Sequence, residues 1–331
     1  MTSHLLEIQF LGEHAVIGFF ILSGYLMTYV MQNTYGYDRP LAFALNRALR
    51  LYPMHLLVTM GTLVILTTVG DATSFRRVMY IPSTFTEWAQ NLSLIYLNWF
   101  PDRVSPRLSP PTWALTVELF FYALIALGLS KTRFTTFFWL VASCSYMVSA
   151  HIFDQVFAYR YYSILAGSFP FALGATLYHF RKEIGRLSDR FAADKYVALG
   201  LLVFIANIGL PLAFAETTLS AISVHFAFYA NYAINFTLIA ILMAWTSKRI
   251  SRRADAFWGQ LSYPLYLMHL QIGFMISMMV WGEPITGLDP VGLFAFAISL
   301  PTCLALSAIA AMAIDRPVQK YRAKISTARK A

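Results

Sequence analysis

Long apolar stretches without charges recur along the whole chain, and they constrain its fold more than any other feature. An α-helix needs about 20 mostly apolar residues to cross the roughly 30 Å hydrocarbon core of a bilayer. Only 12% of the 331 residues are charged, about half the fraction that is usual in soluble domains. We therefore expect an all-α, polytopic membrane bundle that occupies residues 1–331 as one domain, with no separate soluble domain. Nine spans are predicted near residues 12–32, 51–70, 112–130, 134–151, 161–180, 196–214, 223–247, 259–281 and 290–314.

Basic residues are distributed unequally between the two sides of this predicted topology. Of the 25 Lys and Arg residues, 20 fall in alternate loops and in the C-terminal tail. The positive-inside rule places that side of the membrane in the cytoplasm, so we expect a cytoplasmic C-terminus. The net charge of +9 reflects this bias and does not indicate binding to nucleic acid.

Glu118 is the charged residue that falls inside a predicted span rather than at a span edge. A charge at the centre of a bilayer costs about 2.5–3.5 kcal/mol on insertion scales, so an ionisable residue that persists there is a candidate for function. The alternative is a structural carboxylate that pairs with an arginine or is protonated among the helices.

Two other groups of residues stand out before any comparison is made. Ser23 and Gly24 lie in the middle of the first span, where small residues let helices approach closely. Arg47 and Arg50 end the first cytoplasmic loop and share a face if that loop end is helical. Because both arginines are expected in a loop, their removal should leave no buried charge unpaired. Pro53 fits the first turn of the next helix.

Residues 71–111 form the longest predicted connection, on the outer side. Their short apolar segment 91–97 cannot span a membrane, so we expect it to lie in the interface or to re-enter. The two cysteines, Cys144 and Cys303, fall within spans and are expected to be small packing residues. The sequence has no metal-ligand spacing and no phosphate-binding glycine loop, so we expect neither a metal nor a tightly bound cofactor.

Five short motifs, in the same order, carry a resemblance to membrane acyltransferase family 3. This family includes bacterial O-acyltransferases that modify O-antigen, peptidoglycan, Nod factors and exopolysaccharides. The motifs are residues 19–26 (FFILSGYL, similar to FFxxSGFL), 47–53 (RALRLYP, similar to RxxRxxP), 113–122 (WALTVELFFY, similar to WSLxxExxFY), 261–269 (LSYPLYLMH, similar to LSYxxYLxH) and 314–317 (IDRP, similar to a closing E-x-P).

The resemblance implies an enzyme of the bacterial inner membrane. It implies transfer of an acyl group, expected to be acetyl from acetyl-CoA, to a hydroxyl of a saccharide or lipid-linked saccharide at the outer face. His4 would take the hydroxyl proton and Glu118 would orient the histidine or stabilise its charged form. His14 is a second candidate for the base. Arg47 and Arg50 would bind the phosphates of acyl-CoA, or would simply reflect the positive-inside bias.

A further set of residues is expected to line the acyl or acceptor path. Tyr263, Tyr266 and His269 recur every three residues and line one face of a helix. Their alternative role is packing with satisfied hydroxyl groups. The expected partners are acyl-CoA, the saccharide acceptor and membrane lipid. The full set of path residues is Ser23, Tyr122, Tyr263, Tyr266 and His269.

The resemblance departs from the family at the front of the chain. The family has ten helices, and its first helix carries an arginine and then the catalytic histidine. That arginine has no counterpart here, and His4 would stand at the outer end of the missing helix. We expect either that the true start lies upstream of Met1 or that this chain lacks its catalytic base.

Two other functions remain open at this point. A transporter or acyl-flux protein could also combine a helical bundle with one buried carboxylate, although the paired broken helices of inverted repeats are not found. A catalytically inactive relative could instead serve as a membrane partner in polysaccharide assembly.

Overall fold

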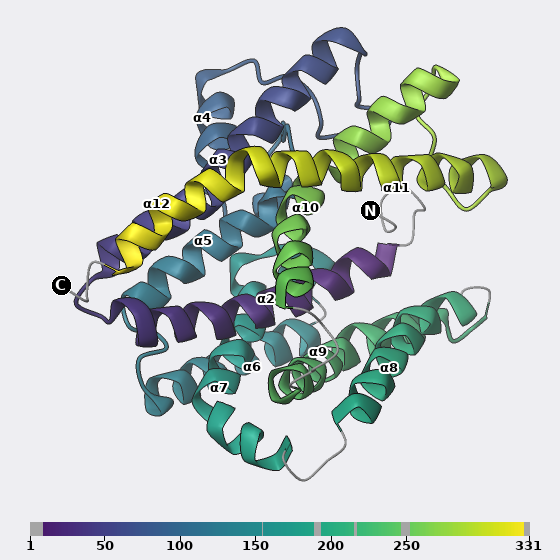
Figure 1. Ribbon diagram of the computed structural model, residues 1–331. Helices are drawn as coiled ribbons and strands as arrows, with labels where there is room; N and C mark the ends of the chain where they lie inside the picture. Colours follow the sequence, from purple (N-terminus) through teal and green to yellow (C-terminus); the bar gives the residue numbers. More distant parts are fainter. Residues whose placement is uncertain (1–8, 154, 189–192, 215–216, 246–251, 328–331) are drawn as a thin grey trace. The chain divides into compact units, whose positions relative to one another are not determined.

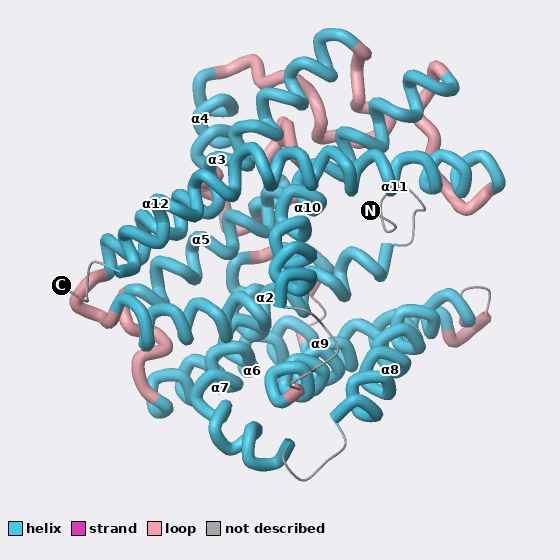
Figure 2. Tube along the Cα trace, in the orientation of Figure 1, coloured by secondary structure: helices cyan, strands magenta, loops and turns pink. Residues whose placement is uncertain are grey.

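The computed structural model describes residues 9–153, 155–188, 193–214, 217–245 and 252–327. Eleven α-helices, α2 to α12, make up most of these residues, which contain no strand (Figure 2). The all-α prediction is confirmed. The helices fall into two compact units: the first includes Arg39–Val117 and Ser251–Ala331, and the second comprises Gln9–Asp38 and Glu118–Ile250. The single domain expected for residues 1–331 stays a prediction.

Each of the nine predicted spans coincides with a helix. Three of these helices are less clearly spanning: α5 (Thr112–Ala126) is apolar but has only 15 residues, and the other two are α6 (Arg133–Ile152) and α7 (Ile164–Ser188). Among the described residues, six segments are long and apolar enough to cross a membrane by length and composition: Gly12–Tyr35, Pro40–Thr68, Lys195–Ala213, Ser220–Met243, Ala256–Trp281 and Pro290–Ile325.

The second unit is organised around α2 (Gln9–Val30), which packs on α7 and α9 (Ser220–Ala244); α8 (Ala193–Ala213) lies beside α9 (Figure 1). Helices α2 and α7 touch through their backbones. A Cβ atom added at Gly174 would lie 1.9 Å from the carbonyl oxygen of Ile21, and one added at Gly24 would lie 2.2 Å from that of Phe171. The close approach predicted at Ser23 and Gly24 is therefore present.

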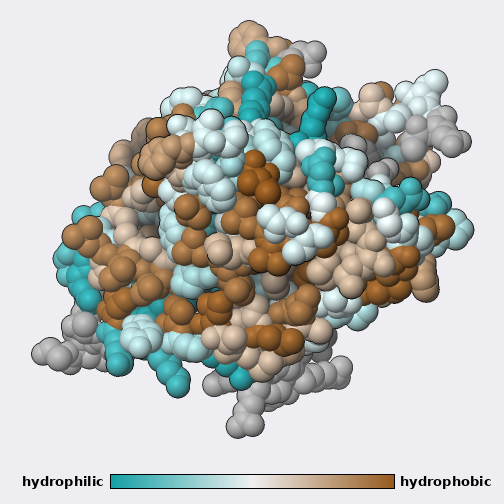
Figure 3. Space-filling model, turned by 90° about the horizontal axis from the view of Figure 1, so that it is seen from above, coloured by the Kyte–Doolittle hydropathy of each residue, from teal (hydrophilic) through white to brown (hydrophobic). Residues whose placement is uncertain are grey.

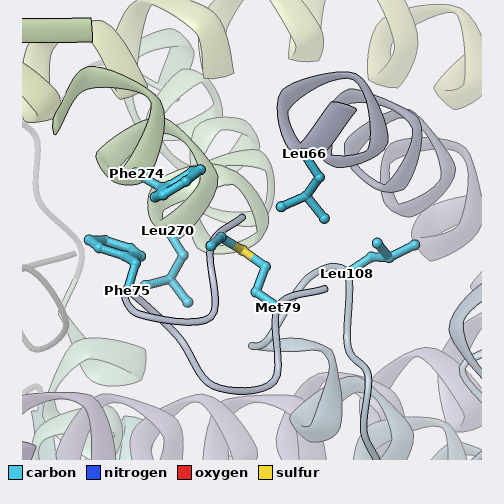
Figure 4. Packing of buried hydrophobic residues seen from close by; sticks show 7 residues of the cluster. Leu66, Phe75, Met79, Leu108, Leu270 and Phe274 are labelled. Carbon is cyan, nitrogen blue, oxygen red and sulfur yellow. The ribbon is translucent and has the colours of Figure 1, made fainter. Parts of the chain in front are cut away.

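The first unit contains α3 (Pro40–Thr68), α4 (Phe85–Ser93), α10 (Arg252–Trp281), α11 (Pro290–Ala310) and α12 (Arg316–Thr327). Helix α10 packs on α11 and α3, and α12 lies along α3 (Figure 1). An apolar cluster fixes the long connection 71–111 onto this framework (Figure 4). Phe75 of the connection packs against Phe274 of α10, with ring centroids 5.7 Å apart, so the connection has a core of its own. The cluster consists of Leu66, Ala72, Phe75, Met79, Leu108, Leu270 and Phe274.

The segment 91–97 is tied into this connection by Asn91. The Asn91 side chain donates a hydrogen bond to the carbonyl of Pro106 and accepts one from the backbone N–H of Leu108, both at 2.9 Å. Helix α4 ends at Ser93, and the next residue, Leu94, has a left-handed φ of 58° and a fully buried side chain. The expected interfacial or re-entrant position of the segment 91–97 stays a prediction.

The second span begins earlier than the sequence indicated. Pro40, not Pro53, occupies the first turn, and Pro53 lies inside α3. A helix of 29 residues is about 43 Å long, more than the roughly 30 Å of a hydrocarbon core. The expected arginine-bearing loop is therefore a helical extension of the span, because a proline inside a long apolar helix does not have to end it.

Apolar side chains are also abundant on the surface, as the brown residues of Figure 3 show. Leu202, for example, is 63% exposed and Met279 is 72% exposed. Such exposure is costly in water but suits a surface that faces lipid. Cys303 is buried, as predicted for a packing residue, whereas Cys144 is exposed and lines an apolar cavity of about 660 Å³.

The contact between α2 and α7 generates a prediction. Gly174→Ala should lower the free energy of unfolding by about 1–3 kcal/mol, since a methyl group there overlaps the Ile21 backbone. Gly209→Ala in α8 is the matched control, because a Cβ atom added at Gly209 meets nothing within 4 Å. Thermal unfolding in detergent measures both variants. Equal melting temperatures would show that the contact does not limit stability.

Candidate functional site

Glu118 lies in α5 and is only 2% exposed. Two hydroxyl groups donate hydrogen bonds to the same oxygen, Oε1, of its carboxylate. One is the Oγ of Ser23 in α2, at 2.9 Å, and the other is the hydroxyl of Tyr122, one helical turn further along α5. The second unit therefore brings together three residues that the sequence had singled out from two separate motifs.

This arrangement fixes the orientation of a buried carboxylate. Ser23 is 5% exposed and Tyr122 is 7% exposed, so both donors are shielded from competing water. A carboxylate held in this way can orient a histidine and stabilise its charged form. Within the described part of the chain, no three His, Cys, Asp or Glu side chains are grouped so that they could hold a metal ion.

Of the two candidate histidines, His14 lies within the described residues. His4 lies outside the described residues, so its role as the base stays a prediction. His14 lies in α2 and is 1% exposed. Its backbone carbonyl accepts a hydrogen bond from the side chain of Asn231 in α9, at 3.2 Å. This contact supports a packing position for the α2 backbone at His14.

In the first unit, three of the five motifs meet at Arg50. The guanidinium of Arg50 lies 3.7 Å from the carboxylate of Asp315 in the motif 314–317. It also lies over the ring of Tyr263 in the motif 261–269, 5.6 Å from the ring centroid. The hydroxyl of Tyr263 in turn donates to the carbonyl of Leu51, at 2.8 Å. Arg50 thus has both an ionic and an aromatic partner.

Arg47 lies one turn before Arg50 on α3, so the predicted shared face is present. Its Nη2 donates to the side-chain oxygen of Asn46, at 2.7 Å. That oxygen also accepts from the Nε of Arg322 in α12, at 3.2 Å, and the Asn46 amide donates to the Arg322 carbonyl, at 3.1 Å. Buried Asn46 therefore joins the arginine motif to α12.

The other two predicted path residues of α10 also have backbone partners. The hydroxyl of Tyr266 donates to the carbonyl of Pro111, at 2.7 Å. The Nδ1 of His269 lies 2.7 Å from the carbonyl of Tyr266, and this histidine is 4% exposed. These contacts support the packing account of Tyr263, Tyr266 and His269, and their position along an acyl or acceptor path stays a prediction.

Asp315 belongs to the motif 314–317, but the sequence did not predict its pairing with Arg50. Asp315 is the last residue of a short π-helical segment, Ala311–Asp315, that continues α11. The Asp315 side chain is buried, with Asp315 only 5% exposed. The expectation that removing Arg50 leaves no buried charge unpaired is wrong, since Arg50 lies in a helix and faces this carboxylate. The signal in the sequence was the motif itself, but the partner of Asp315 is 265 positions away, and only folding brings the two together.

Comparison with known proteins finds one family model that matches the chain. The family whose model matches is described as an acyltransferase domain, and the match covers residues 2–312. It includes four of the five motifs in full and ends just before the fifth. No curated protein and no solved structure matches the chain.

The pair of Arg50 and Asp315 generates a prediction that a double-mutant cycle can test. Arg50→Ala should destabilise the protein because it takes from a buried carboxylate the cation with which it forms an ion pair. Combining it with Asp315→Asn should recover part of the loss, with a coupling free energy of about 0.5–3 kcal/mol in unfolding measurements. As a control, Arg39→Ala should be additive with Asp315→Asn, since Arg39 donates instead to the carbonyl of Ile325. Additivity in the Arg50 cycle would contradict the interaction.

Proposed function

Since the chain belongs to the acyltransferase domain family and is a multi-pass membrane acyltransferase, we propose that it moves an acetyl group from acetyl-CoA to a saccharide hydroxyl at the outer face of a bacterial inner membrane. The family supports acyl transfer in general. The observation that carries the proposal is the buried carboxylate of Glu118, which accepts hydrogen bonds from Ser23 and Tyr122.

The proposed reaction needs a base and a means of holding it. The base takes the proton of the acceptor hydroxyl while that oxygen attacks the acetyl carbonyl. The thioester bond then breaks, and the CoA sulfur leaves as a thiolate that can take up the proton. A positioned general base contributes roughly 10²–10⁴-fold to such a step. In the proposal His4 is the base, and Glu118 positions it.

The donor is proposed to bind through Arg47 and Arg50. Paired guanidinium groups suit phosphate oxygens because they form charge-assisted, often bidentate, hydrogen bonds. Arg50 already shares its charge with Asp315, so Arg47, which is partly buried and contacts a neutral asparagine, is the more informative probe. No contact of the described residues specifically favours a transporter or an inactive membrane partner.

Glu118→Gln is the central test of this function. Glutamine keeps the volume and an oxygen that can accept from Ser23 and Tyr122, but it lacks the charge that stabilises an imidazolium. We expect acetylation of the saccharide to fall by at least about 100-fold, with an unchanged melting temperature of the protein. Mass spectrometry of the saccharide measures the first quantity, and thermal unfolding in detergent measures the second.

The matched control is Glu283→Gln, which removes an exposed carboxylate in a connection between helices. It should retain full acetylation. If Glu118→Gln loses melting temperature and activity together, the carboxylate is structural. Normal acetylation by a stable Glu118→Gln variant would remove this residue from the mechanism.

The proposed orientation of the membrane helices can be measured separately. A green fluorescent protein fused after Ala331 should fluoresce, because it folds only in the cytosol, and an alkaline phosphatase fused there should be inactive. The reason is the bias of 20 basic residues to one side of the predicted topology. Active phosphatase at this position would reverse the orientation and put Arg47 and Arg50 on the wrong face for acetyl-CoA.

A further inference from the structure

The second unit contains a basic pocket that the proposed mechanism does not use. It is a cavity of about 340 Å³ near the turn that joins α5 to α6 and the C-terminal half of α7. Four of its lining residues are Lys or Arg. The complete lining is Gln32, Lys131, Thr132, Arg133, Tyr178, His179, Arg181 and Lys182.

The turn that forms one wall of the basic pocket is held in place at several points. Gln32 donates to the backbone carbonyl of Lys131, at 2.7 Å, and to that of Ser130, at 3.2 Å. The Nε2 of His179 lies 3.1 Å from the same Ser130 carbonyl, and Thr28 donates to the Ser130 hydroxyl, at 3.0 Å. The pocket is therefore a built feature of the fold and not a gap beside a loose loop.

Positive charge exceeds negative charge around this cavity. Arg133 forms an ion pair with Glu183, at 2.6 Å. Over the part of the chain with described structure, Lys131, Arg181 and Lys182 have no carboxylate within ion-pairing distance of 4.0 Å. Three cations therefore face or border one cavity without an acidic partner among the described residues.

Aromatic rings hold two of these cations in position. The guanidinium of Arg181 lies 4.0 Å from the ring centroid of Tyr178 and donates to the Tyr178 carbonyl, at 2.8 Å. The ammonium of Lys131 lies 5.4 Å from the ring centroid of Tyr37. Stacking leaves the edge of a guanidinium available to a further acceptor, because the ring occupies only its face.

We propose that this pocket binds a phosphoryl group, carried either by a soluble nucleotide or by a lipid headgroup. A phosphate offers up to two negative charges and several acceptor oxygens, which match a stacked arginine and two lysines. The positive-inside bias accounts for basic residues in this turn, but it does not account for their convergence on a cavity with fixed walls. Neither Arg47 nor Arg50 lines this cavity, so the pocket is proposed in addition to the donor site at those two residues.

The test uses the purified full chain in nanodiscs of zwitterionic phosphatidylcholine, with adenosine 3′,5′-bisphosphate as the soluble probe. Lys131→Gln combined with Lys182→Gln should weaken its binding by at least about 10-fold in calorimetry, because two charge-assisted contacts are lost. Lys131→Arg combined with Lys182→Arg should retain binding. Lys320→Gln, an exposed lysine of α12, is the matched control.

A second arm distinguishes the source of the phosphate. Nanodiscs that contain phosphatidylglycerol should raise the melting temperature of the wild type, but not of the double Gln variant, if the ligand is a lipid headgroup. The pocket is supported if the double Gln variant, but not Lys320→Gln, loses either the binding of the nucleotide or the stabilisation by phosphatidylglycerol. If that variant matches Lys320→Gln with both probes, the proposal is overturned. Saccharide acetylation is measured in parallel, so that loss of phosphate binding with normal acetyl transfer separates this pocket from the function proposed for Glu118.

Discussion

The backbone contact between α2 and α7 is the constraint on which the second unit depends. Helices that meet at Gly24 and Gly174 come closer than any residue with a side chain would allow. Ser23 stands next to Gly24 and reaches the carboxylate of Glu118 from α2. In a bilayer, where lipid is as apolar as the helix surface, such close packing and buried hydrogen bonds stabilise association more than apolar burial does. One pair of glycines thus positions the donor that holds the buried charge.

The sequence predicted what depends on composition along a single helix. The helical spans and the isolation of Glu118 both follow from hydropathy, and Ser23 and Tyr122 were named because they stand in recognisable motifs. Neither hydropathy nor motifs encode distance between motifs. Arg50 and Asp315 each stand in a motif, but their pairing joins distant positions that no motif relates. Lys131 and Arg181 look like ordinary basic residues in the sequence, and only folding places both beside one cavity.

Charge in this protein serves two physical purposes at once. Basic residues near the ends of spans generally orient helices during insertion, and they are the basis of the predicted orientation. In the folded chain, some of the same residues are taken up by specific partners: Arg50 by Asp315 and Tyr263, and Arg133 by Glu183. A count of charges predicts the orientation of the helices, whereas the capacity to bind an anion depends on which cations already have an acidic partner. Arg50 and Lys131 each add one positive charge to the predicted cytoplasmic side. In the fold, Arg50 is paired with Asp315, whereas Lys131 has no carboxylate within ion-pairing distance among the described residues.

The proline inside α3 has a consequence for how α10 is docked. Pro53 has no N–H group, so the carbonyl of Leu49 loses its partner within the helix and the hydrogen-bond ladder is weakened at this turn. Neighbouring helices commonly supply donors to the backbone around such a break in a membrane. Here the hydroxyl of Tyr263 donates to the carbonyl of Leu51 in that same turn. The turn of α3 that Pro53 weakens is therefore also a turn at which α10 is held by a hydrogen bond. This turn lies next to Arg50, at which three motifs meet.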